Sequence, residues 1–471
     1  MIKKLSNKLS DSGIDASQLL LYCLAMIPCF LCYYFQDMGF TTRHGINVWG
    51  ALFSGKILNY YSLNMEPYIY TNTLRCPAHY PFPIYIVFAI WDLPLYIYEH
   101  LTKTNFLDST LCILYSKIIL FVFFIIAAKA FKRICEFFSF DAKKTNLCFF
   151  FWVTSSLFIE PFFVVAQYDI FSIAFTLWGI FYYLKNDNKK FLLFFAIAIS
   201  FKYFALFAFI PLLLYREKNI LKILAYSFIA VIPTLFFRIL FFKDMSGISQ
   251  AMNLSMGLIS YIRSGIQIHF NEVLIPSFFL AYVIFVFVLY FAKPGNNPVY
   301  AILLPLISFS IFFVLCFSHF YWIILISPYI ALLVFINENY EKNILLELIF
   351  STAFILRNFL QEPFYFNPQA FNLSPIRNFA EFDWKDTVFS VSRLFSLGKY
   401  DWLEIPLIIC AFAVGLIYFI IFNSKKRETQ IISALPVKDT FKALTWLRLC
   451  VNLFLCLFQL LLLIPANILL K

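Results

Sequence analysis

Long apolar runs recur along the whole chain, and short polar segments separate them. Runs of about 17 to 25 residues are long enough to cross a bilayer as α-helices. Membranes admit only helices and closed barrels, and a barrel would show short strands of alternating polarity instead. The pattern predicts an all-α polytopic membrane protein, a single domain over residues 1–471, with about eleven spans. These lie near residues 18–35, 107–128, 145–166, 170–184, 221–241, 273–291, 299–317, 321–336, 343–359, 404–422 and 446–467.

The apolar run over 191–214 differs from the others because basic residues flank both of its ends. Since basic residues favour the cytoplasmic side, both ends are expected there. We therefore predict a re-entrant helical hairpin that breaks near Ser200, Phe201 and Lys202. In one straight helix Lys202 would lie about 16 to 18 Å from either end, beyond the reach of a lysine side chain. At a hairpin tip its ammonium can meet the phosphate of a lipid substrate; the alternative is a pair with a buried acid on another helix.

The basic segments 129–144 and 185–190 set the expected orientation. They are cytoplasmic if the apolar run after the amino terminus is an uncleaved anchor with its amino end inside. The segments expected outside are then 36–106, a first outer loop with interfacial helices, and the loops 242–272 and 360–403.

This orientation requires that the apolar run over 82–98 does not cross the membrane. The run is short and contains Pro83, Asp92 and Pro94, so we expect a helix that lies at the outer interface. Labelling from outside should then reach positions 168 and 260 but not 140.

Composition changes this picture little. Phe occurs 63 times and Gly only 12 times, which indicates helices packed through bulky side chains. The net charge of +11 resides mainly in short loops at span ends, so it favours cytoplasmic loop bias over nucleic-acid binding. The 11 cysteines are scattered without the spacing of a zinc or redox motif. Because no P-loop, dinucleotide fingerprint or HExxH motif is present, we expect no nucleotide, no catalytic zinc and no resident cofactor, and the sequence identifies no metal-ligating residues.

Charged and polar residues from distant parts of the sequence fall on the same expected outer face. Asp37 follows the first span, and Gln167, Tyr168 and Asp169 follow a later one. Because several outer segments cover this face, we expect an extracytoplasmic active site there. The further candidates on this face are Glu66, Arg263, His319 and Arg377.

Several of these features resemble the GT-C superfamily of integral membrane glycosyltransferases. The likeness is greatest to the branch of the GPI mannosyltransferases and the dolichyl-phosphate-glucose-dependent glucosyltransferases, and it covers about residues 1–340. It is carried by Asp37 at the end of the first span, the outer-loop end Tyr80-Pro81-Phe82-Pro83, the group Gln167-Tyr168-Asp169, and Ser200-Phe201-Lys202 followed by Pro211. Two positions depart from the family pattern. Asp37 is followed by Met38-Gly39 without a second acid, and Val165-Ala166 stand where the family has His-Phe.

The resemblance implies a GT-C-like bundle with large outer loops that transfers a hexose, with mannose favoured. The implied donor is a polyprenyl-phosphate sugar, and the acceptor is a glycan, a lipid or a protein. The expected location is the plasma membrane, in contact with membrane lipids. Asp37 is the expected catalytic base. The expected substrate contacts are Gln167, Tyr168, Asp169, Lys202, His319, Arg263 and Glu66.

The chemistry of such a donor asks little of the protein. A polyprenyl phosphate is a good leaving group, so a single displacement needs one carboxylate to deprotonate the acceptor and cations to hold the phosphate. It inverts the anomeric carbon. Each of these residues also has a simpler possible role. Asp37 can end a span, Gln167 and Asp169 can cap a helix, His319 can belong to an aromatic belt, and Arg263 can contact a lipid headgroup. If Asp37 is not the base, the alternatives are Glu66, Asp92 and Asp169.

A transporter or flippase for a lipid-linked sugar is the alternative function. Such proteins also have many spans and a polar site, but they usually contain internal repeats and helices interrupted in corresponding halves. The sequence shows no such repeat, and its large loops lie on one expected face only. These two features favour an enzyme.

Overall fold

The computed structural model describes residues 14–64, 78, 80–246, 262–270, 273–293, 297–316, 318–337, 339–361, 401–424 and 439–461. Within these residues the chain is almost entirely helical, which confirms the all-α class. The exception is a short antiparallel hairpin of β1 (Gln267–Phe270) and β2 (Val273–Pro276), in which Gln267 pairs with Pro276 and Phe270 with Val273. Strand β2 occupies the start of the span expected over 273–291.

The remaining elements follow in chain order. The first part consists of α2 (Ala16–Cys32), α3 (Gln36–Phe53), η1 (Ile57–Asn59), α4 (Tyr60–Leu63), α5 (Phe82–Thr102), η2 (Phe106–Asp108) and α6 (Thr110–Phe137). The middle part consists of α7 (Ala142–Val153), α8 (Ser156–Ile159), the π-helical turn η3 (Glu160–Val164), α9 (Asp169–Leu184), α10 (Asn188–Phe201), η4 (Tyr203–Ala205), α11 (Leu206–Arg216), α12 (Ile220–Leu240) and α13 (Phe242–Ser246). The last part consists of α16 (Ser277–Phe291), α17 (Tyr300–Leu315), η5 (Phe320–Leu325), α18 (Ser327–Ile336), α19 (Tyr340–Gln361), α22 (Asp401–Ser424) and α23 (Asp439–Leu461).

Five of the described helices are long and apolar enough to cross a membrane, namely α5, α6, α12, α22 and α23. A sixth candidate arises if α7 and the helical stretch Ser156–Val164 form one span with a bend of 62°. Most of the other expected spans coincide with apolar helices of 10 to 17 residues, such as α2, α9, α16 and α17. The helices are therefore those of a membrane protein, and the count of eleven spans stays a prediction.

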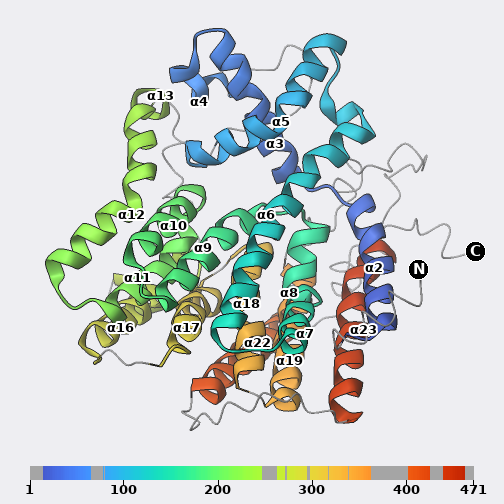
Figure 1. Ribbon diagram of the computed structural model, residues 1–471, viewed down its shortest axis with the longest axis vertical. Helices are drawn as coiled ribbons and strands as arrows, with labels where there is room; N and C mark the ends of the chain where they lie inside the picture. The colour runs from blue at the N-terminus through green and yellow to red at the C-terminus, as the bar shows by residue number, and fades with distance from the viewer. Residues whose placement is uncertain are drawn as a thin grey trace, which may run out of the picture.

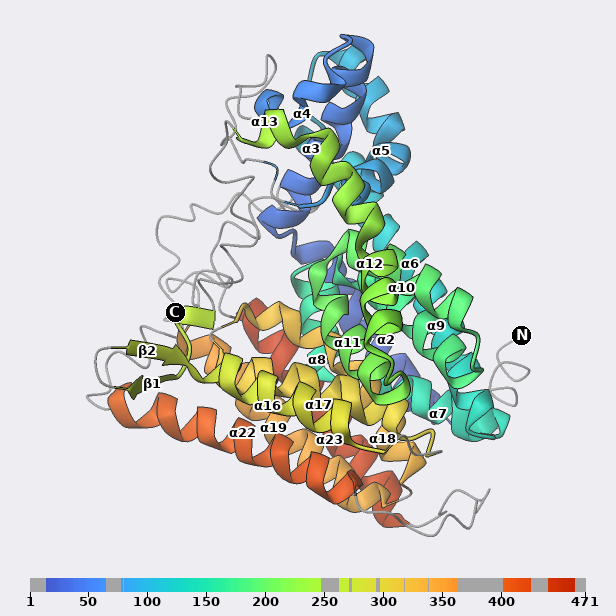
Figure 2. The same ribbon diagram turned by 90° about the vertical axis from the view of Figure 1, so that its left-hand side faces the viewer.

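One end of the molecule is formed by α3, α4, α5 and α13, which lie beyond the bundle that contains α7, α8 and α16 to α19 (Figures 1 and 2). The sequence predicts an interfacial helix over 82–98. The observed helix α5 has 21 residues, which is also long enough for a span. Its placement relative to a membrane stays a prediction.

Helix α3 occupies the beginning of the segment expected as the first outer loop. It packs closely on α5 at Gly45, where an added Cβ would lie 2.7 Å from the Cβ of Phe88 and 3.1 Å from the backbone nitrogen of Ala89. A larger residue would force the two helices apart. Glycine is therefore needed at this contact, even though bulky side chains dominate most of the packing.

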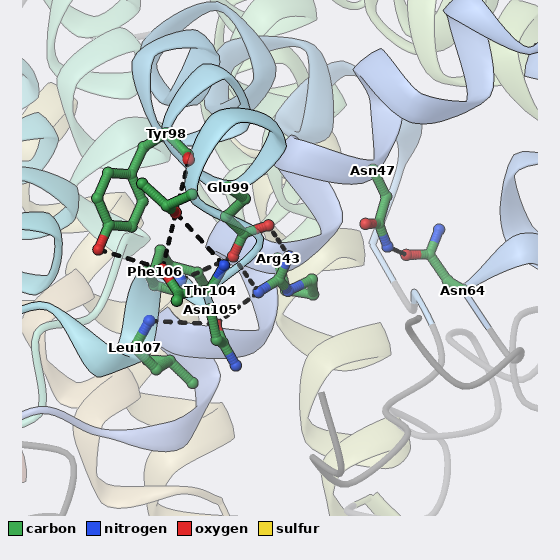
Figure 3. Close-up of polar contacts among 10 residues, drawn as sticks. Arg43, Asn47, Asn64, Tyr98, Glu99, Thr104, Asn105, Phe106 and Leu107 are labelled. Carbon is green, nitrogen blue, oxygen red and sulfur yellow. Dashed lines mark hydrogen bonds and ion pairs between the residues drawn. The ribbon is translucent and has the colours of Figure 1, made fainter. Parts of the chain in front are cut away.

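A buried ion pair links α3 to α5 and to the turn that follows α5 (Figure 3). The guanidinium of Arg43 donates to both carboxylate oxygens of Glu99, and its Nη2 also donates to Asn105 Oδ1 at 2.6 Å. Glu99 Oε1 accepts a further hydrogen bond from the backbone N–H of Phe106 at 2.7 Å. The bidentate geometry fixes the end of α5 against the middle of α3.

The predicted break in the run over 191–214 is confirmed at Lys202. This residue has extended backbone angles, φ −152° and ψ 131°, between α10 and η4. Helices α10 and α11 fold back on each other, because Arg216 at the end of α11 donates to Asn188 Oδ1 at the start of α10 at 3.1 Å. The two helices form a hairpin with Lys202 at its tip, and its re-entrant placement in a membrane stays a prediction.

A second buried ion pair binds the two residues at the break between α7 and α8. Arg448 of α23 donates to both carboxylate oxygens of Glu347 on α19, at 2.7 and 3.0 Å. It also donates to Thr154 Oγ1 at 2.9 Å, and Ser155 donates to Glu347 Oε1 at 2.7 Å. The side chains of Arg448 and Glu347 are 2% and 0% exposed. The two charges therefore neutralise each other. They also form hydrogen bonds with Thr154 and Ser155, the two residues between α7 and α8.

Replacement of Arg448 by methionine should strongly destabilise the protein, because Glu347 would remain buried without its counter-charge. We expect a loss of about 3 to 5 kcal/mol in the free energy of unfolding. Unfolding of the purified protein in detergent measures this loss. The double variant Arg448→Met/Glu347→Gln should recover part of it, and Arg133→Met, on an exposed pair with Glu136, should have little effect.

The ends of the helices that carry the basic segments are adjacent, as the expected orientation requires. Lys185 Nζ, just after α9, lies 5.4 Å from the ring centroid of Phe137 at the end of α6. Tyr168, expected to be reachable from outside, is only 1% exposed, and position 260 lies outside the described residues. The accessibility of position 168 was therefore predicted wrongly, because the residue packs inside the bundle.

Exposed positions give a better test of the orientation. In a variant whose native cysteines are replaced, a membrane-impermeant maleimide should label Thr104→Cys on intact cells. Ala142→Cys should be labelled only after permeabilisation. Both positions are exposed and flank α6, so they lie on opposite sides if α6 crosses the membrane. The reverse pattern would invert the orientation.

Candidate functional site

Four segments that are distant in the sequence meet around Asp37. Asp37 lies in the first turn of α3, and Gln167 precedes α9, whose first residue is Asp169. Lys202 is at the tip of the α10–α11 hairpin, and Tyr321 lies in η5. The structure thus brings together Asp37, Gln167 and Asp169, which the sequence predicted to converge, and adds Lys202 and Tyr321 to them.

Two neutral groups hold the carboxylate of Asp37. Gln167 Nε2 donates to Asp37 Oδ2 at 3.2 Å, and the hydroxyl of Tyr321 donates to the same oxygen at 3.1 Å. Among the described residues, Asp37 Oδ1 accepts no hydrogen bond. The side chain of Asp37 is half-buried, whereas Gln167 is fully buried. One oxygen of the carboxylate is therefore anchored, and the other is available to a ligand.

The position of Asp37 depends on how the end of α2 is held. Buried Lys117 of α6 donates to the carbonyl oxygens of Phe30 and Tyr33, with a distance of 2.6 Å to the latter. These carbonyls belong to the last turn of α2 and its C-cap, which have no partner within the helix. The ammonium of Lys117 thus caps the C-terminal end of α2, and Asp37 follows four residues after Tyr33.

A strained turn positions Gln167. Ala166 has a left-handed backbone with φ +56°, which costs a residue with a Cβ about 1 to 2 kcal/mol. The turn follows the π-helical stretch η3, and the backbone N–H of Gln167 donates to the carbonyl of Pro161 at 2.9 Å. Strain of this kind is common at functional sites, where surrounding structure maintains it.

Lys202 and Asp169 form a buried ion pair beside Asp37. The ammonium of Lys202 donates to Asp169 Oδ1, and the two side chains are 7% and 0% exposed. The Nζ atom lies 5.2 Å from the ring centroid of Tyr168, 5.5 Å from that of Tyr80 and 5.9 Å from that of Phe204. The alternative of a pair with a buried acid on another helix is therefore the observed one, and α9 supplies the acid.

His319 lies at the edge of the same group. Its ring stacks on Tyr321 with centroids 5.2 Å apart and an interplanar angle of 6°, and it makes an edge contact with Trp322. It is also close enough to Asp169 for an electrostatic interaction. His319 therefore belongs to the cluster, although its aromatic contacts are those expected of a packing role.

The remaining candidates do not join the cluster in the described structure. Arg263 is exposed, and its side chain has no hydrogen bond or ion pair with the described residues. Asp92, the other candidate base on α5, is buried, and neither of its carboxylate oxygens has a hydrogen-bond partner among the described residues. Glu66, Arg377 and most of the loop 360–403 lie outside the described residues. Asp169 is not a helix cap, because its side chain pairs with Lys202 and Tyr168 is the N-cap residue.

The polarity of the cluster is set by its two carboxylates. A carboxylate only accepts hydrogen bonds, so the Gln167 amide must present its NH₂ to Asp37, and Tyr321 must donate its proton. Gln167 Oε1 and Asp169 Oδ2 are buried and have no hydrogen-bond donor among the described residues. Unpaired acceptors of this kind are costly, and both atoms are enclosed by protein. The half-buried carboxylate of Asp37 is the acceptor of the cluster that a ligand hydroxyl can reach.

The donor set does not resemble a metal site. Within the part of the chain that the structure describes, no group of three or more His, Cys, Asp or Glu side chains is arranged to hold a metal ion.

Comparison with protein-family models, curated proteins and solved structures finds no match. The function of this chain is therefore inferred from its own residues and their geometry.

Two contributors to the site were not predicted from the sequence. Tyr321 was not expected to contact Asp37, because nothing in its local pattern indicates a contact with a residue 284 positions away. Phe204, whose ring centroid lies 5.9 Å from Lys202 Nζ, was not singled out, although it lies close to the hairpin tip in the sequence. Their roles depend on tertiary contacts that no local spacing reveals.

The ion pair changes what is expected of Lys202→Met. The sequence predicts that this variant folds normally, but Asp169 would now remain buried without its counter-charge. We expect a loss of about 3 to 5 kcal/mol in the free energy of unfolding. The double variant Lys202→Met/Asp169→Leu should recover much of this loss in detergent unfolding experiments. Additive effects of the two single variants would show that the pair does not exist in solution.

Proposed function

We propose that this chain is an inverting glycosyltransferase that moves a hexose from a polyprenyl-phosphate sugar to an acceptor hydroxyl. The observation that carries the proposal is the half-buried carboxylate of Asp37, of which one oxygen is anchored and the other accepts no hydrogen bond from the described residues. An acceptor hydroxyl can donate to that second oxygen. The resemblance of the surrounding motifs to GT-C enzymes supports the lipid-linked donor, with mannose favoured.

In this reaction Asp37 Oδ1 removes the proton of the acceptor hydroxyl. The acceptor oxygen forms a bond to the anomeric carbon of the donor from the face opposite the phosphate. The bond between that carbon and the phosphate oxygen breaks, and its electron pair leaves with the polyprenyl phosphate. The transferred proton remains on Asp37 until solvent takes it, and the anomeric configuration is inverted.

Lys202 is the proposed contact to the departing phosphate. An ammonium has three N–H donors, and Asp169 accepts one of them. Among the described residues the other two have no hydrogen-bond partner. Negative charge grows on the phosphate oxygen as the sugar departs, so a positioned cation stabilises the transition state more than the ground state. Asp169 keeps this cation in place between turnovers.

The location proposed for the site is the outer face of the plasma membrane. The support is the expected orientation, which places the loop between the first two spans outside. Asp37 lies at the start of that loop, just after α2. The acceptor can be a glycan, a lipid or a protein that carries a free hydroxyl.

Asp37→Asn should lower the transfer rate by about 10²- to 10⁴-fold. Asparagine keeps an oxygen for Gln167 and Tyr321 to bind, so the fold and donor binding should persist. The measurement uses the purified protein in nanodiscs with a radiolabelled polyprenyl-phosphate hexose and a series of acceptors. Nuclear magnetic resonance of the product should show an inverted anomeric centre.

Glu136→Gln is the matched control, because it is also an acid-to-amide change but lies on the surface in a pair with Arg133. It should transfer at the wild-type rate. If Asp37→Asn is as active as wild type, another residue is the base. Movement of the intact lipid-linked sugar across the bilayer, without a new glycosidic bond, would favour a flippase instead.

A further inference from the structure

Tyr321 is the second donor to the carboxylate of Asp37, and it lies 284 residues further along the chain. Its hydroxyl lies 3.1 Å from Asp37 Oδ2. The residue is 4% exposed and belongs to the 3₁₀ helix η5. The other donor, Gln167, approaches the same oxygen at 3.2 Å from the turn before α9. Two rigidly held donors on one oxygen define the rotation of a carboxylate.

The ring of Tyr321 is itself held on more than one side. His319 stacks on it with nearly parallel rings, and Phe35 packs against it with centroids 6.1 Å apart. Phe35 is the N-cap residue of α3, the helix that carries Asp37. The ring is therefore fixed against the same helix end whose carboxylate it binds. Such double support is what keeps a catalytic group within tenths of an ångström of its working position.

The direction of the hydrogen bond is determined by chemistry. An ionised carboxylate cannot donate, so the Tyr321 hydroxyl proton must point to Oδ2. Oδ2 then already accepts two hydrogen bonds, from Tyr321 and from Gln167. Oδ1 has no hydrogen bond with the described residues, which leaves it as the oxygen that can receive a proton from a ligand.

We propose that Tyr321 is a positioning residue, which turns Oδ1 of the base Asp37 toward the acceptor hydroxyl. This inference rests on the proposed function. It assigns a task to a residue that touches the carboxylate and not the reacting atoms. The charged groups near Asp37 are the Lys202–Asp169 pair, from α9 and the hairpin tip, and His319, which precedes η5. The hydrogen bonds that the structure shows to Asp37 come from Gln167 and Tyr321.

The test removes only the hydroxyl, in the variant Tyr321→Phe. The phenyl ring keeps the contacts with His319 and Phe35, so the protein should fold. We expect kcat to fall by about 10- to 100-fold, because a small displacement of a general base has effects of this size. The KM of the polyprenyl-phosphate hexose should stay within about twofold, since Tyr321 does not contact the donor. A purely structural role would instead lower the melting temperature or the active fraction.

Tyr22→Phe is the matched control. The hydroxyl of Tyr22 donates to the carbonyl of Val153, also at 3.1 Å, so this variant loses one tyrosine hydrogen bond elsewhere in the bundle. Its kcat should equal that of wild type. An equal loss of kcat in both variants would overturn the inference, because it would show a general effect of weaker packing.

A double-variant cycle separates this inference from the proposed function. In the background of Asp37→Asn, where no base remains, Tyr321→Phe should lower the residual rate by less than about twofold. A full 10-fold further loss would overturn the positioning role. Wild-type kcat for Tyr321→Phe together with an inactive Asp37→Asn would also overturn it, while the base assignment would survive. An active Asp37→Asn would overturn the assignment of the base itself.

Discussion

A charge buried among apolar side chains is costly unless an opposite charge or several dipoles face it, and this constraint determines much of the architecture. Among the described residues, three buried ion pairs join different helices or a helix and a turn. They are Arg448 with Glu347, Lys202 with Asp169, and Arg43 with Glu99. To break any of them would leave a charge buried and uncompensated. Helices that apolar packing alone would leave free to slide are thereby fixed in one arrangement.

Asp37 differs from the carboxylates in these pairs. Glu347 and Glu99 face arginines and Asp169 faces a lysine, whereas Asp37 is held by an amide and a phenol, both neutral. An amide and a phenol orient the carboxylate of Asp37 without placing a positive charge on it, and its second oxygen accepts no hydrogen bond from the described residues. In the proposed reaction Asp37 is accordingly the base, and its neighbour Asp169 holds a cation.

Hydropathy and charge were enough to predict much of the fold. The helical class, most helix positions and the break at Lys202 follow from the length of the apolar runs and from one lysine that no straight span could accommodate. The convergence of Asp37, Gln167 and Asp169 was also predicted, although Arg263, predicted to lie with them, does not join them. The hydrogen bond from Tyr321 and the pairing of Arg448 with Glu347 were not, because such contacts depend on how helices rotate against each other. The buried position of Tyr168 was missed for the same reason.

The hydrogen bonds to Asp37 also bear on the order of biosynthesis. Its two donors lie 130 and 284 residues further along the chain. Asp37 and its helix emerge from the ribosome early, yet the group around the carboxylate is incomplete until residue 321 has been synthesised and packed. A chain synthesised only as far as α17 would contain the aspartate without the phenol that orients it. Contacts of such long sequence separation carry a large entropic cost of loop closure. Under the proposed function, the nascent protein should therefore remain inactive at least until Tyr321 has been synthesised and packed.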